Sequence, residues 1–285
     1  MSKFIHWYPG HIAKAQRQLK EKLNLVDVII EVIDSRIPYS SRYKDIEKLC
    51  PNKKRLILMN KSDLSDENFN KNWAKVIEKQ TKSKVLVTNL SKKNDIKLIT
   101  NILVELSQDI MQKRLSKGLQ IRPVRTMVVG MPNTGKSSTI NRLVGRAKTK
   151  TGAKAGVTRQ QQWVRINDKI ELLDTPGIIP TVQDDQFQAA KLAMVNSIGD
   201  NAYESEYVAF ELLKILEKLY ESEVRNYYNL ENDEINLDSI ALKRNWVIKG
   251  GEADIKRAAL TVLSNFREGK IGKFTIERPQ DYGLI

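Results

Sequence analysis

The stretch GMPNTGKSSTIN, Gly130 to Asn141, decides the fold of this chain. It matches the pattern G-x-x-x-x-G-K-S, in which backbone N–H groups wrap phosphate oxygens, a lysine ammonium reaches the β- and γ-phosphates, and a serine hydroxyl binds Mg²⁺. An apolar run, TMVVG, precedes the loop, and helical spacing over Ser137 to Leu143 follows it. The motif requires this strand, loop and helix, so we predict a phosphate-binding loop.

The phosphate loop and two later segments would hold the nucleotide phosphates and Mg²⁺. DTPG, Asp174 to Gly177, ends an apolar run; Asp174 would enter the Mg²⁺ shell and the Gly177 N–H would contact the γ-phosphate. Thr158, in a small and basic segment, is the candidate third element that closes over both. Ser137 would bind Mg²⁺ directly. From the loop itself we expect nucleotide contacts from Asn133, Thr134, Gly135, Lys136, Ser137 and Ser138.

A second motif, NKSD, follows the apolar run RLILM and would select the base. The carboxylate of Asp63 can accept hydrogen bonds from the N1–H and N2 amino groups of guanine, which adenine lacks. Asn60 would bond the base edge, the Lys61 stem would pack on the ring, and Ser62 completes the motif. Thr88, Asn89 and Leu90, after the next apolar run, would line the base through main-chain contacts. We therefore predict GTP as the ligand, which disfavours an ATPase or a small-molecule kinase.

Six short apolar runs alternate with helical patterns over the first part of the chain. Together with the motifs, this alternation predicts an α/β P-loop GTPase fold with a mainly parallel six-stranded sheet and its ligand loops at the carboxyl ends of the strands. Beyond about Gln183 the strand pattern stops and amphipathic helical spacing continues to the end. We expect a GTPase domain over residues 1–182 and a smaller all-helical, RNA-binding domain over residues 183–285.

The order of the motifs is permuted, because the base motif precedes the phosphate loop. The complete set in this order resembles the circularly permuted GTPases. Within them, WYPGHIAKA, D-x-R-x-P at Asp34 to Pro38, NKSD, GMPNTGKSS, GVTR, DTPGI and GGEADIKRAAL resemble the ribosome biogenesis GTPase A family over essentially the whole chain. The resemblance implies a GTPase that assists late assembly of the large ribosomal subunit by binding its rRNA, with rRNA and ribosomal proteins as partners.

The catalytic group is not obvious from the motifs. Ile178 follows DTPG, where Ras-like enzymes place a glutamine that orients water. The resemblance implies that His11, in the N-terminal PGH motif, is catalytic, and imidazole can orient water or share a proton near neutral pH. A purely structural His11, capping or packing the first helix, is the alternative. The resemblance also makes Asn133 a K⁺ ligand, so that K⁺ would supply the charge of an arginine finger.

Permutation also brings the chain from Gly177 within a few residues to the helical domain. We therefore predict that the nucleotide state sets the position of that domain, and that GTP hydrolysis drives release from RNA. Turnover would be stimulated by the ribosome. The alternative from a different class is an RNA-binding assembly scaffold that uses GTP as a structural ligand with negligible turnover.

A formal net charge of +14 indicates polyanion partners, although a lysine-rich source proteome would produce it too. The single cysteine, Cys50, excludes an intramolecular disulfide framework. No apolar run approaches the ~18 residues of a membrane span. We expect a cytoplasmic, ribosome-associated monomer. Its candidate RNA contacts are Lys14, Arg17, Lys20, Lys22, Lys243, Arg244, Lys249, Lys256, Arg257 and Arg267.

Overall fold

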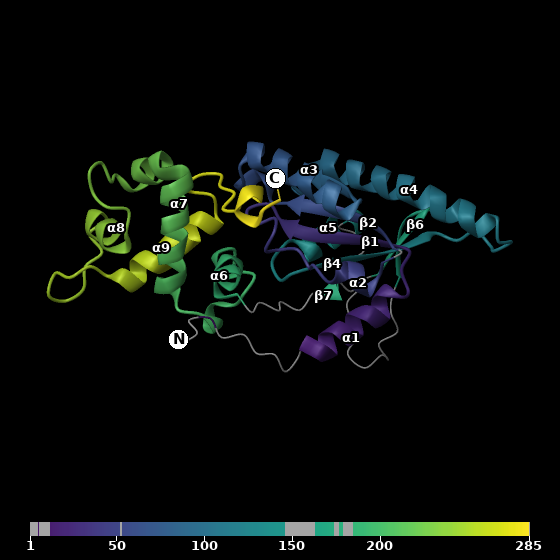
Figure 1. Cartoon of the computed structure of the whole chain (residues 1–285), viewed down its shortest axis with the longest axis horizontal. Helices are drawn as coiled ribbons and strands as arrows, with labels where there is room; N and C mark the ends of the chain where they lie inside the picture. Colours follow the sequence, from purple (N-terminus) through teal and green to yellow (C-terminus); the bar gives the residue numbers. More distant parts are fainter. Residues whose placement is uncertain are drawn as a thin grey trace.

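The computed structural model describes residues 5, 12–51, 53–145, 163–173, 177–178 and 185–284. A β-sheet with helices on both faces forms one end of the molecule, and a group of helices forms the other (Figure 1). The predicted α/β fold followed by a helical part is thus confirmed. Within the described ranges, no helix combines the length and the apolar character needed to cross a bilayer.

The sheet follows the order β3-β2-β1-β4-β6-β5, and a short strand β7 pairs with β4. All neighbouring strands run parallel except β5, which is antiparallel to β6. The predicted six strands are therefore present. Their bounds are β1 Val28–Asp34, β2 Lys54–Asn60, β3 Lys84–Val87, β4 Val124–Gly130, β5 Trp163–Asn167, β6 Ile170–Leu173 and β7 Gly177–Ile178.

The chain reverses its direction of travel across the sheet between β1 and β4. It places β2 and β3 on one side of β1 and then returns to place β4 on the other. In an open parallel sheet, ligands bind outside the carboxyl ends of the strands at such a switch point. The phosphate loop follows β4 and NKSD begins at the end of β2, so both motifs reach this edge.

Helices cover both faces of the sheet. Side chains of successive strand residues point to opposite faces, and β1 is buried along its whole length. Val28, Ile30 and Val32 pack on one face against α4 (Lys93–Leu115) and α5 (Lys136–Val144). The other face packs against α1 (Ile12–Leu23), α2 (Ile46–Leu49) and α3 (Glu67–Thr81). The continuous apolar runs of the sequence follow from this burial on both sides.

The helical part shares its core with the loops at the carboxyl edge of the sheet. It consists of α6 (Gln186–Met194), α7 (Ser205–Tyr228), α8 (Leu237–Lys243) and α9 (Ile255–Arg267), which bury one continuous apolar cluster. That cluster also includes Ile37, in the loop after β1, and Met131, in the phosphate loop. The phosphate loop is therefore packed into the helical core.

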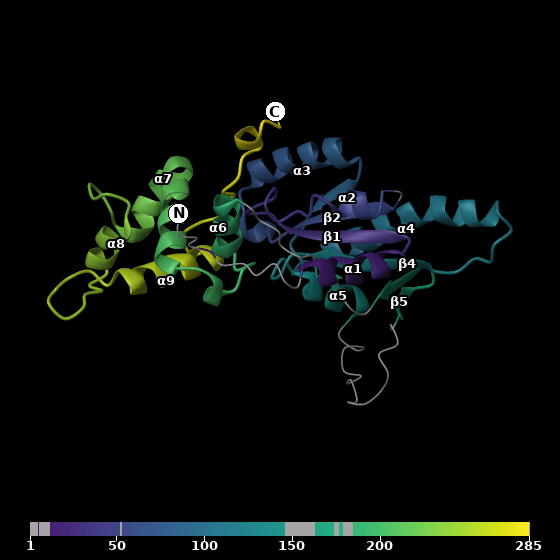
Figure 2. The same cartoon turned by 60° about the horizontal axis from the view of Figure 1, so that its bottom comes forward.

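After α9 the chain leaves the helices and returns to the sheet, a feature that the helical spacing did not predict. Phe274 N donates to Leu64 O at 3.1 Å, and Ile276 N donates to Arg36 O at 2.9 Å. Trp73 of α3 donates through its indole to Glu277 O at 2.9 Å. Figure 2 shows this C-terminal segment passing from the helical part to α3. We call residues 268–284 the return segment.

Glu277 fixes the return segment through a buried carboxylate. It accepts hydrogen bonds from Tyr39 N at 2.7 Å, Ser40 N at 3.1 Å and the Tyr282 hydroxyl at 2.6 Å. Its Oε1 also lies 3.5 Å from Nζ of Lys191, which α6 supplies and which is equally buried. One carboxylate thus joins the loop after β1, α6 and the return segment.

Replacing Glu277 by glutamine should destabilise the whole fold. The amide would present a donor to backbone N–H groups and leave the Lys191 ammonium buried without its counter-charge, a loss of about 3 kcal/mol in the free energy of unfolding. Urea denaturation measures it. Glu268→Gln, on the exposed start of the return segment, is the control and should unfold like the wild type; equal midpoints for the two variants would contradict this account.

Candidate functional site

The phosphate loop is fixed by bonds to its own backbone. The Thr134 hydroxyl donates to Met131 O at 2.9 Å, and Lys136 Nζ donates to the same carbonyl at 2.6 Å. Burial of Lys136 lowers the pKa of its ammonium to about 8. Gly135, at the start of α5, has a φ of 108°, in the left-handed region that favours glycine. A partly desolvated cation and the free N–H groups of a helix start suit a phosphate.

The NKSD motif contacts the phosphate loop directly. Asn60 Nδ2 donates to Thr134 O at 2.9 Å, and a side chain on Gly135 would collide with that same amide. Lys61 takes the left-handed conformation, with a φ of 63°. Asp63 lies in the 3₁₀ turn η2 (Ser62–Leu64) with its side chain exposed. Two motifs that lie far apart in the sequence therefore form one wall.

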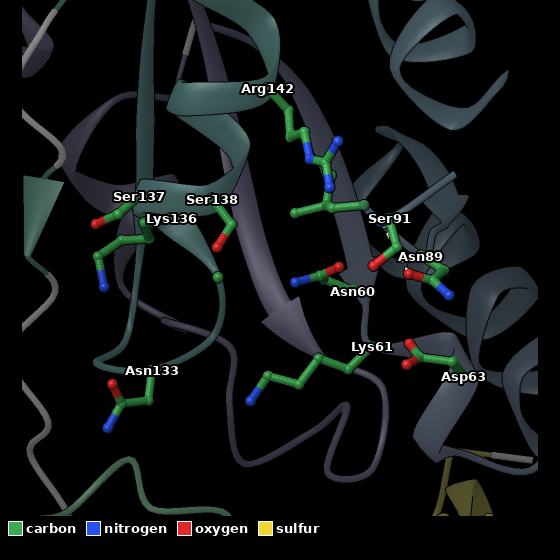
Figure 3. Close-up of a pocket in the computed structure, with 12 residues that line it drawn as sticks. Asn60, Lys61, Asp63, Asn89, Ser91, Asn133, Lys136, Ser137, Ser138 and Arg142 are labelled. Carbon is green, nitrogen blue, oxygen red and sulfur yellow. Dashed lines mark hydrogen bonds between the residues drawn. The ribbon is translucent and has the colours of Figure 1, made fainter. Parts of the chain in front are cut away.

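A cavity of about 440 Å³ opens between these loops (Figure 3). Asp63 and Asn89 lie on one side of it, and Lys136 and Ser137 lie on the other. Base and phosphates could thus reach their expected partners at the same time. The predicted site residues that line the cavity are Asn60, Lys61, Asp63, Asn89, Asn133, Gly135, Lys136, Ser137 and Ser138.

Three predicted contact residues do not line the cavity and lie behind its wall: Ser62, Thr88 and Thr134. Thr88 and Thr134 are fully buried. Ser62 N donates to Thr88 O at 3.1 Å, which joins the base motif to the end of β3. Thr134 offers its carbonyl to Asn60. In this geometry they support the residues that face the cavity.

Additional residues line the cavity that we did not predict as contacts. Ser91 N donates to Asn89 Oδ1 at 2.9 Å, and Asn89 N donates to Asp95 Oδ2 at 2.7 Å, which fixes the loop after β3. Arg142 also lines the cavity, as does Leu90, which was predicted together with Thr88 and Asn89. Arg142 lies four residues after Ser138 on α5, and this spacing, which places side chains on the same helix face, was the signal available in the sequence.

The expected metal site can be tested only in part. His11, Thr158 and Asp174 lie outside the described residues. Ser137, at the start of α5, is exposed to the cavity, and among the residues described no group of three acidic, His or Cys side chains could hold a metal ion by itself. The Ser137 hydroxyl offers an oxygen donor, the type of ligand that Mg²⁺ takes. Gly177 pairs with Val129 of β4, directly before the phosphate loop.

The phosphate loop also contacts the turn that follows α6. Asn133, exposed and in the left-handed conformation, donates through Nδ2 to Asn196 O at 2.5 Å. The Ser197 hydroxyl donates to Pro132 O at 2.8 Å. The amide oxygen of Asn133 is not used in this bond and could face a ligand. The cavity is therefore bordered by the helical part on its phosphate side.

Comparisons with known proteins find relatives that cover almost the whole chain. A family model described as "50S ribosome-binding GTPase" matches residues 125–229. Ribosome biogenesis GTPase A of Bacillus cereus is 37% identical over 283 residues, which are 98% of this chain and 95% of that protein. The GDP-bound structure of TM YlqF is 30% identical with a TM-score of 0.66 and covers 93% of this chain and 100% of that chain. GNP-bound YlqF from T. maritima is 28% identical with a TM-score of 0.66, and the match covers 94% of this chain and 99% of that chain.

Gly135→Ala should abolish nucleotide binding. Gly145→Ala is the matched control, because Gly145 also has a positive φ but a side chain there would meet open space. Both variants place alanine at a positive φ, which strains the backbone by about 1–3 kcal/mol, whereas only Gly135→Ala displaces Asn60 from the cavity wall. Titration with a fluorescent GDP analogue measures the difference. Equal affinities for the two variants would contradict the proposed wall.

Proposed function

Because this chain belongs to the ribosome biogenesis GTPase A family and is therefore a GTP hydrolase, we propose that it binds the large ribosomal subunit and its rRNA and promotes late subunit assembly. GTP hydrolysis then drives its release. Residues 1–182 serve as the permuted GTPase domain and residues 183–285 as the RNA-binding domain. The observation that carries this proposal is the direct contact of the phosphate loop with the turn after α6, at Asn133 and Asn196.

In this proposal the cavity holds GTP with its base at Asp63 and its phosphates at Lys136. The Asp63 carboxylate pairs with the guanine N1–H and N2 amino groups. Lys136 would neutralise phosphate charge, and the Ser137 hydroxyl together with Asp174 and Thr158 would hold Mg²⁺. When bound, Mg²⁺ would offset the charge that develops on the transferred phosphoryl group. A change at the phosphates would pass to the helical part through Asn133.

Catalysis requires a group that orients water, and Ile178 cannot do so. We assign this task to His11 and assign the role of K⁺ ligand to Asn133. The bond from Asn133 Nδ2 to Asn196 O supports the second assignment, because it leaves the amide oxygen free to bind a cation. A K⁺ ion there would add positive charge beside the phosphates.

The surface around α8 and α9 suits RNA. Arg257 lies over the Trp246 ring at 5.3 Å, and Arg244 lies 5.6 Å from the Tyr227 ring. Cationic and aromatic groups held together can bind phosphates and stack on bases. Lys249 and Lys256 are exposed beside them. Arg267 is used within the chain instead, since it donates to Met194 O, Ala193 O and the Tyr203 hydroxyl.

Co-sedimentation with large-subunit particles tests the function. We expect a monomer in the cytoplasmic fraction that binds the particles with a GTP analogue and is released with GDP, and its binding should weaken as salt rises, since phosphate contacts release counterions. The alternative, a scaffold that keeps GTP as a structural ligand, would be favoured by a different result. In that result, binding to the particles does not depend on the nucleotide and the particles do not stimulate hydrolysis.

The same particles test the catalytic assignments. His11→Ala should retain GTP binding and lower the stimulated turnover by about 100-fold, the lower range for a general acid–base group. His6→Ala, which changes the other histidine of the chain, is the control. Replacing K⁺ by Na⁺ should lower turnover in the wild type but not in Asn133→Ala. Unchanged turnover in His11→Ala would leave His11 a structural residue.

A further inference from the structure

A buried charge cluster lies beside the base end of the cavity, where the D-x-R-x-P motif follows β1. The Asp34 carboxylate is fully buried and accepts from Arg36 at both oxygens, at 2.9 Å from Nε to Oδ1 and 2.8 Å from Nη2 to Oδ2. Lys61 Nζ, from the NKSD motif, lies 2.7 Å from the same Oδ2. One carboxylate thus holds two cations, one of which lines the cavity.

The electrostatics of the cluster depend on all three groups. Burial alone would raise the pKa of the Asp34 carboxyl, but Arg36 and Lys61 together hold it well below its usual range. Asp34 is therefore an anion that both cations stabilise. Because its ammonium donates to the buried Asp34 carboxylate, the Lys61 side chain is held in one position.

Arg36 continues the cluster into the helical part. Its Nη1 donates to Arg267 O, in the last turn of α9, at 3.3 Å, and its guanidinium lies 5.5 Å from the centre of the Phe266 ring. The return segment holds the same loop, since Ile276 N donates to Arg36 O at 2.9 Å and Thr275 Oγ1 donates to Ser35 O at 3.3 Å. The position of Arg36 therefore depends on how α9 is seated.

We infer that Asp34 is a positioning residue for guanine recognition, because it fixes the position of Lys61. Arg36 contacts both Asp34 and α9, so the contact between Asp34 and Lys61 depends on the position of α9. The inference rests on the proposed function, in which the cavity binds a guanine nucleotide. Linkage between two sites is reciprocal. A nucleotide packed on Lys61 strengthens the seating of α9, and displacement of α9 by a bound partner weakens the hold on the nucleotide.

The Asp34→Asn variant of the full chain tests the first step. It removes the charge but keeps the shape, and Lys61 loses its anion. We expect the Kd for a fluorescent GDP analogue to rise about tenfold, within the range of coupling in one charged network. Glu31→Gln is the matched control: Glu31 lies in the middle of the same strand, is equally buried and pairs with Arg55 at 3.4 Å. Glu31→Gln should unfold at a lower urea concentration than the wild type but bind the GDP analogue with the same Kd.

A double-variant cycle shows whether Asp34 acts through Lys61. In the background of Lys61→Met, the additional change Asp34→Asn should cause no further loss of affinity. A merely structural role for Asp34 would not produce this result, because two independent losses add. Additive losses would overturn the inference.

The second step is tested from the helical part. Phe266→Leu removes the ring beside Arg36 and should raise the Kd about threefold, as expected for a weakened cation–π contact. Tyr228→Leu is the control, since Tyr228 is also a buried ring of the helical core and packs on Tyr227 rather than beside Arg36. Equal effects of the two variants would overturn the relay to α9. This pair of variants still tests the link from α9 to nucleotide affinity even if Asp34→Asn does not fold.

The proposed function and this inference can fail separately. A wild type that does not bind guanine nucleotides would remove the proposed function. A wild type that binds them, with an Asp34→Asn variant of equal affinity, would remove only the role of Asp34.

Discussion

The hydrogen bond from the Asn60 amide to the Thr134 carbonyl brings the two halves of the candidate site together. It joins the end of β2 to the loop after β4, and these ends meet only because both strands run parallel to β1, which lies between them. A parallel sheet gathers the carboxyl ends of its strands at one edge whatever the order of the strands in the chain. Permutation therefore leaves the cavity intact and changes only what the chain connects to it.

The helical part contacts the loops around the cavity at more places than the permuted order of motifs predicts. The permuted order predicts a link at Gly177, which pairs beside the phosphate loop. The helical part also contacts the cavity at two further places. At the phosphate end, Asn196 and Ser197 bond the phosphate loop. At the base end, Arg267 meets Arg36, which holds Asp34 beside Lys61.

Local patterns predicted the sheet and most of the cavity wall, whereas long-range packing determined the rest. The runs around β1 and β2 are apolar because both faces of these strands are buried, so periodicity and length were sufficient to identify them. The return segment was missed because its extended backbone is held by partners such as Glu277 with Ser40, which lie 237 positions apart. The link from Arg36 to Arg267 spans 231 positions and involves a backbone carbonyl, so no spacing rule predicts it.

The two ends of the cavity would respond to different events. GTP and GDP carry the same base, so contacts at Lys61 and Asp34 would report whether a nucleotide is bound and not which one. Only the phosphate end meets the group that hydrolysis removes, and there the hydrogen bonds come from the exposed Asn133 and the buried Ser197, beside the apolar packing of Met131. Such bonds are individually weak and rearrange at low energetic cost, whereas the buried charges at the base end resist separation. In this proposal the base end therefore acts as the fixed attachment of the helical part, and the phosphate end is where hydrolysis would change its position.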